Sequence, residues 1–99
     1  MVEDSKKVLD DTVTALWQGK TIDMELLRKT IDQTVNEIVE GVDEMRIRGV
    51  TFPMEYVVNA MKHLSECIAS RDDYRLADCI CYEWLEIIGV YDEVMMKIG

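Results

Sequence analysis

The side chains that could do chemistry in this chain are few, and their spacing matches no common type of site. One histidine and three cysteines are the strongest ligand and nucleophile candidates among the 99 residues: His63, Cys67, Cys79 and Cys81. They lack the paired spacing of a zinc site. Cys79 and Cys81 lie about 200° apart around a helix, so they cannot hold one ion or form one disulfide together. We therefore expect no metal ion and no cofactor.

The histidine has one sequence neighbour that could assist it. Glu66 follows His63 by three residues, and a carboxylate at that spacing on a helix can orient an imidazole. The chain carries no nucleophile motif, glycine-rich phosphate loop or Glu-x-x-His pair to accompany it. Glu83 and Glu86 lie beside an apolar stripe, where we expect a solvated face. We therefore expect no catalytic residues, and the protein is predicted not to be an enzyme.

The charge of the chain excludes two classes of partner. Twenty acidic residues against eleven lysines and arginines give a formal net charge of −9. A chain without a basic stripe binds a phosphate backbone poorly and is repelled by anionic lipids, so we expect neither nucleic acid nor membrane as a partner. No apolar run reaches the roughly 20 residues of a membrane span, and the charged N-terminal segment has no signal-peptide core. These features predict a cytoplasmic protein with reduced thiols.

Apolar residues at spacings of three and four predict four helices in a single domain, residues 1–99. The expected helices cover about residues 4–18, 24–48, 53–69 and 73–99. Short turns between them force neighbours to run antiparallel, so we predict an all-α, up-down-up-down four-helix bundle. The first helix is shorter, and could join the bundle or pack across its end. The predicted core is Leu27, Ile31, Val35, Ile38, Val42, Met54, Val57, Met61, Leu64, Ile68, Leu76, Ile80, Trp84, Ile87 and Tyr91.

The last predicted helix is apolar beyond the face that its main stripe would bury. Tyr82, Leu85 and Met96 fall on the opposite side, and Met95 lies at its edge. A helix that is apolar over most of its circumference is either central in its domain or covered by a partner. We predict that Tyr82, Leu85, Met95 and Met96 bind a protein partner. The alternatives are pairing of this face with a second copy of the chain, or packing of the first helix on it.

The start of the last helix resembles a segment of small helical bacterial proteins of unknown function. Their pattern is approximately Asp-Tyr-x-x-Leu-Ala-Asp-x-x-x-Tyr-Glu, and some are encoded near flagellar or flagellin-glycosylation genes. The matching residues here are Asp73, Tyr74, Leu76, Ala77, Asp78, Tyr82 and Glu83. The resemblance implies a motility-associated accessory protein without a known reaction. In size, acidity and helicity the chain is also similar to flagellar export chaperones, which sheathe an amphipathic helix of a partner.

The sequence therefore leaves three functional hypotheses. The first is a protein-interaction module, an adaptor or chaperone-like accessory protein that binds through the outer face of its C-terminal helix. The second is a structural homodimer without a separate partner. The third is a helical bundle that binds a metal ion or a small ligand.

Overall fold

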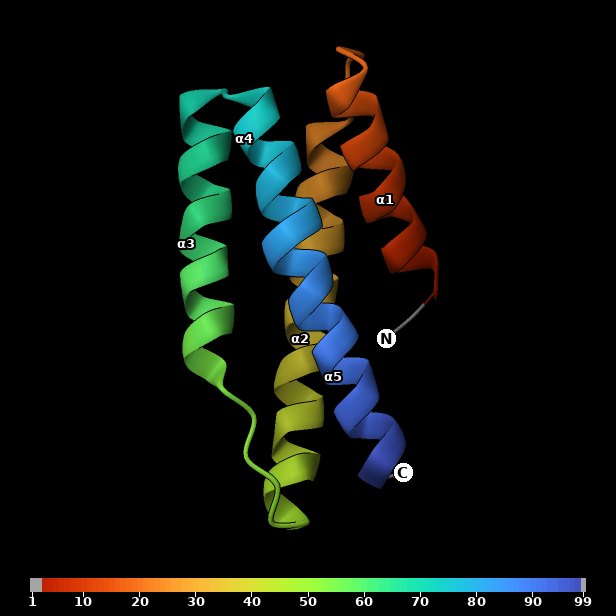
Figure 1. Ribbon diagram of the computed structural model, residues 1–99, viewed down its shortest axis with the longest axis vertical. Helices are drawn as coiled ribbons and strands as arrows, with labels where there is room; N and C mark the ends of the chain where they lie inside the picture. Colours follow the sequence, from red (N-terminus) through yellow and green to blue (C-terminus); the bar gives the residue numbers. More distant parts are fainter. Residues whose placement is uncertain (1–2, 99) are drawn as a thin grey trace.

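The computed structural model describes residues 3–98, which form four helices (Figure 1). The first three are α1 (Glu3–Trp17), α2 (Met24–Ile47) and α3 (Met54–Ser70). The fourth, called the last helix below, is continuous through α4 (Asp73–Asp78), η1 (Cys79–Trp84) and α5 (Leu85–Ile98). The predicted all-α bundle with up-down-up-down order is confirmed. Among the described residues, no helix combines the length and apolarity needed to cross a membrane.

The helices begin and end on local signals that the sequence already shows. Gly19 and Gly49 follow α1 and α2 with φ values of 71° and 77°, a left-handed conformation that glycine adopts without steric cost. Asp23 and Asp72 cap α2 and α4. Each carboxylate accepts a hydrogen bond from the backbone N–H three residues later, at 3.0 and 3.1 Å. These caps set where each antiparallel neighbour starts.

The last helix is the central element of the bundle. Its α4 segment packs against α1 and α3, η1 packs against α3 and α1, and α5 packs against α2. Figure 1 shows it, cyan to blue, in front of α2 and between α1 and α3. The first helix therefore joins the bundle and does not cross its end. An ion pair between Lys6 and Asp92 holds α1 to α5.

Two buried aromatic side chains attach the last helix to α2. The Trp84 indole N–H donates a hydrogen bond to the Thr34 hydroxyl oxygen at 3.0 Å, and both side chains are fully buried. Two turns later, the Tyr91 hydroxyl donates to the Glu37 carbonyl oxygen at 2.9 Å. The Tyr91 ring lies directly against Gly41, where any side chain would occupy the same space. These contacts thus fix the position and rotation of the last helix on α2.

The last helix contains a π-helical segment, η1, which the sequence pattern did not predict. Buried side chains recur at Leu76, Ile80, Trp84 and Ile88, always four residues apart. In an ideal α-helix each such step drifts about 40° around the axis. In η1 the Leu85 N–H donates to the Ile80 carbonyl, five residues earlier, and this wider turn reduces the drift. These four apolar residues, spaced four apart, can therefore all face the core.

The buried core differs from the predicted core at the margins of the apolar helix faces. Ile88 is buried where Ile87 was expected, because the π-helical turn shifts the buried face by one residue. Met61 was predicted to be core but is exposed, because α3 does not pack closely on α2. Three further predicted core residues are only partly buried at the margin of the cluster: Val35, Met54 and Ile68. The other predicted core residues are buried.

Two glycines inside helices should respond to alanine in opposite directions. A Cβ atom at Gly89 meets nothing within 4 Å, whereas one at Gly41 overlaps the Tyr91 ring. Gly89→Ala should raise the free energy of unfolding by about 1 kcal/mol, since alanine favours a helix. Gly41→Ala should lower it by about 1–3 kcal/mol, since overpacking displaces a hydrogen-bonded ring. Urea unfolding measures both, and the same sign for the two variants would contradict the packing described.

Candidate functional site

A groove runs between α3 and the last helix, and two residues of the α2–α3 loop line one end of it. It has a volume of about 520 Å³. Its lining, called the α3 groove below, is Phe52, Pro53, Tyr56, Asn59, Ala60, His63, Tyr82, Glu83, Glu86, Ile87 and Val90. Phe52 and Ala60 are buried in its floor, and Tyr56 and Tyr82 are exposed on its two walls. The groove therefore combines an apolar floor with large aromatic side chains that reach solvent.

The floor of the groove is held by Tyr91, which also attaches the last helix to α2. The Phe52 ring meets the Tyr91 ring edge-on, with centroids 6.0 Å apart and an interplanar angle of 88°. Tyr91 is in turn hydrogen-bonded to α2. The loop end of the groove is thus held through Tyr91, and its shape depends on the position of that ring.

Three chemically active side chains meet at the end of the groove nearest α4. His63 Nδ1 lies 2.7 Å from Glu83 Oε1. One donor atom each from His63, Cys79 and Glu83 lies within 4.8 Å of the other two. A second pocket of about 360 Å³ opens over this cluster, and Cys67, Arg75, Asp78 and Tyr82 complete its lining. An imidazole, a thiol and a carboxylate therefore share one accessible pocket.

The thiol in this cluster is held in its protonated form. Burial, together with the hydrogen bond and negative charge of Glu83, raises the pKa of Cys79 from 9.0 to about 12. Cys67, which is also buried, adds to the effect. Because the thiolate is the nucleophile, Cys79 is unreactive as a nucleophile at neutral pH.

The sequence offered Glu66, three residues along the same helix, as a carboxylate that could orient the His63 imidazole. The carboxylate beside the imidazole belongs to Glu83, which the sequence placed on a solvated face but which is half-buried. Helical spacing reveals residues that are neighbours on one helix, but it cannot reveal neighbours that lie on two different helices. The distances of the three residues from the turn at Asp72 could have indicated the cluster. His63 lies nine residues before Asp72, and Cys79 and Glu83 lie seven and eleven residues after it. In an antiparallel hairpin these positions face one another.

The four residues predicted to bind a partner differ in their exposure and surroundings. Tyr82 is 64% exposed and lies in the α3 groove. Met96 is 82% exposed and lies outside the groove lining. Leu85 and Met95 are half-buried and pack against the core. Leu85 lies two turns before Asp92, the ion-pair partner of Lys6, so the two side chains share one face of the last helix.

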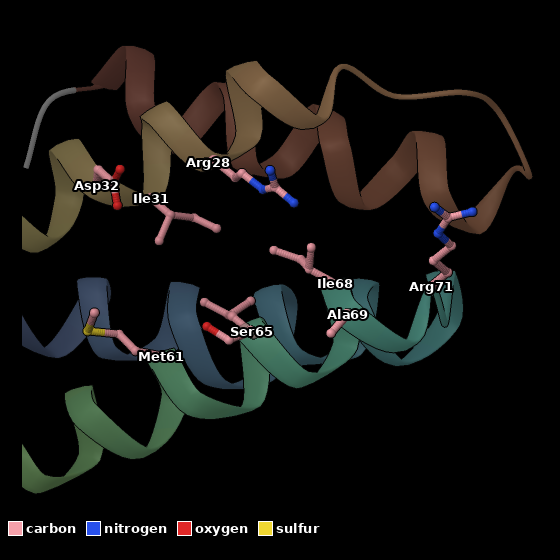
Figure 2. Close-up of a pocket in the computed structure, with 9 residues that line it drawn as sticks. Arg28, Ile31, Asp32, Met61, Ser65, Ile68, Ala69 and Arg71 are labelled. Atoms are coloured by element: carbon pink, nitrogen blue, oxygen red, sulfur yellow. The ribbon is translucent and has the colours of Figure 1, made fainter.

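A separate cleft lies between α2 and α3 (Figure 2). It measures about 570 Å³ and is lined by Arg28, Ile31, Asp32, Met61, Leu64, Ser65, Ile68, Ala69 and Arg71. Ile31 and Ile68 point into it from opposite sides, Arg28 lies near its middle and Arg71 lies at one end. Its lining offers no imidazole or thiol. The α3 groove, which has both beside it and carries Tyr82, is therefore the candidate functional site.

Comparison of the chain with protein-family models, with curated proteins and with solved structures gives no match in any of the three. The resemblance to small helical bacterial proteins stays a prediction.

The raised pKa of Cys79 predicts a loss of stability at alkaline pH. An unfolded chain releases this proton near pH 9.0 and the folded protein near pH 12. The stabilisation is thus complete below pH 9 and is lost as the pH rises toward 12. Cys79→Ala should flatten the decline in unfolding free energy over this range by up to about 1.4 kcal/mol per pH unit.

Urea unfolding between pH 8 and 11, with reductant and chelator present, measures this slope. Cys81→Ala is the matched control, because it removes a half-buried thiol of the same segment that lies outside the pocket lining. It should keep the wild-type slope. Equal slopes for the wild type and Cys79→Ala would show that the thiol is not held as described.

Proposed function

We propose that the protein is a small acidic protein-interaction module, an adaptor or chaperone-like accessory protein, which binds a partner segment in the α3 groove. The observation that carries this proposal is the groove with an apolar floor and two exposed tyrosines, Tyr56 and Tyr82. Tyrosine is enriched at protein interfaces because its rigid ring gives a large contact area at little entropic cost. The predicted outer face of the C-terminal helix contributes to this surface through Tyr82.

The partner that fits best is an amphipathic segment with both apolar and basic side chains. Apolar anchors of a helix, spaced three or four residues apart, suit a groove whose floor is formed by Phe52 and Ala60. Glu83 and Glu86 line the same groove, and the chain carries a net charge of −9. This field attracts a basic segment and speeds its association.

A second copy of this chain fits the groove less well than such a partner. Two copies that each carry a charge of −9 repel one another, and each would present glutamates to the acidic lining of the other. The structural homodimer is therefore the alternative. A stable dimer of the purified chain, measured by its mass in solution, would favour it over the proposal.

The proposal places the protein in the cytoplasm as a non-catalytic accessory protein. Its cysteines are free, and Cys67 and Cys79 are buried among apolar side chains, as is typical of proteins in a reducing compartment. The motility-associated role implied by the sequence resemblance is compatible with an adaptor or chaperone-like activity.

Photo-cross-linking from position 82 in cells tests the proposal. A photoreactive residue in place of Tyr82 should form an adduct with a partner protein, because position 82 lies in the groove. The matched control is the same residue in place of Tyr74, which is 67% exposed on α4 and lies outside the groove lining. Equal adducts from both positions, or an adduct with twice the mass of the chain, would contradict the proposal.

Substitution of the same pair measures the contribution of Tyr82 to affinity. Tyr82→Glu should weaken binding of the cross-linked partner by at least about 30-fold, the effect of a central aromatic anchor. Tyr74→Glu should leave binding unchanged, and both variants should melt near the wild-type temperature because both side chains are exposed. Similar affinities for the two variants, measured by titration calorimetry, would place the binding surface elsewhere.

A further inference from the structure

We infer that His63, Cys79 and Glu83 form a binding site for a zinc-like divalent transition-metal ion, at the end of the α3 groove nearest α4. The three residues offer an imidazole nitrogen, a thiol sulfur and a carboxylate oxygen, which are the donors that zinc takes from proteins. A thiolate donor disfavours magnesium and calcium, which prefer oxygen ligands.

The positions of the donor atoms suit a tetrahedral ion. Zinc bonds of about 2.0–2.3 Å place tetrahedral donor atoms about 3.3–3.6 Å apart. The donor atoms of the cluster lie within 4.8 Å of one another, and His63 Nδ1 and Glu83 Oε1 lie 2.7 Å apart. The sulfur of Cys79 is fixed by burial, whereas His63 and Glu83 are partly exposed and can move. These two side chains can therefore adjust toward the tetrahedral spacing around the fixed sulfur.

The charges of the cluster also suit a divalent cation. A thiolate and a carboxylate together carry two negative charges, which balance the ion in a partly buried place. A bound cation stabilises the thiolate form of the sulfur ligand, so binding should release a proton.

The ion has a route to the site and room for a fourth ligand. The pocket of about 360 Å³ opens over the three donors. Arg75 and Asp78 line it with opposite charges, so its wall adds no net repulsion. A water molecule can occupy the coordination position that faces the pocket, an arrangement with three protein ligands that is known for zinc.

The expectation of no metal ion rested on spacing along single helices. The donors come from two antiparallel helices, and both donors of the last helix lie in η1, at positions 79 and 83. π-helical turns are rare and occur frequently at functional sites. Metal binding at this place does not require the proposed partner, and it is measured without one.

Cobalt titration of the reduced, chelator-treated full chain tests this inference. One equivalent of Co²⁺ should produce the visible bands of a tetrahedral ion and a thiolate-to-cobalt charge-transfer band in the near ultraviolet. One equivalent of Zn²⁺ should displace it. His63→Gln should weaken binding at least about tenfold, and this variant should fold because His63 is exposed. Cys79→Ser should abolish the charge-transfer band.

Two matched variants control for general effects on the fold. Cys81→Ser removes a thiol outside the pocket lining, and Glu86→Gln removes a groove carboxylate outside the cluster. Both should bind Co²⁺ as the wild type does. The inference is overturned if the folded wild-type chain gives no cobalt bands, or if the bands persist unchanged in both His63→Gln and Cys79→Ser.

Discussion

The hydrogen bond from the Trp84 indole to the Thr34 hydroxyl is the contact on which the rest of the structure depends. Both groups are fully buried, so a broken bond would leave a donor without water or protein to accept it, at a cost of about 1–3 kcal/mol. Tyr91 repeats the constraint two turns later, where its hydroxyl reaches the Glu37 carbonyl and its ring requires glycine at position 41. Rotation or sliding of the last helix on α2 would break both contacts. These two contacts therefore fix the position of the last helix.

The open surfaces of the molecule follow from this position. The inner face of the last helix packs on α2, and the helix therefore lies between α1 and α3. Because α3 packs on α4 and η1 and not closely on α2, it is left with an opening on each side. The opening toward the last helix has the more apolar floor, the exposed tyrosines and, at one end, the imidazole, thiol and carboxylate. Partner binding and metal binding are therefore proposed at neighbouring parts of one surface, and Tyr82 and Glu83 line both.

The sequence predicted the parts of the fold that local signals determine. Apolar spacing located the helices, and Gly19, Gly49 and Asp72 marked their ends, because caps and turns depend on a few adjacent residues. The patch of Tyr82, Leu85, Met95 and Met96 was projected on an ideal helix. In the structure that helix contains a π-helical turn, and Leu85 and Met95 pack against the core. The cluster of His63, Cys79 and Glu83 depends on the register of two helices, which no single-helix pattern contains.

A double-mutant cycle measures whether the Trp84–Thr34 hydrogen bond holds the last helix on α2. Thr34→Val and Trp84→Phe are made singly and together, and the free energy of unfolding of each protein is measured in urea. The cycle removes the separate costs of each altered side chain and leaves the interaction between them. We expect a coupling free energy of about 0.5–1.5 kcal/mol between the two side chains. Additive effects, within about 0.3 kcal/mol, would contradict it.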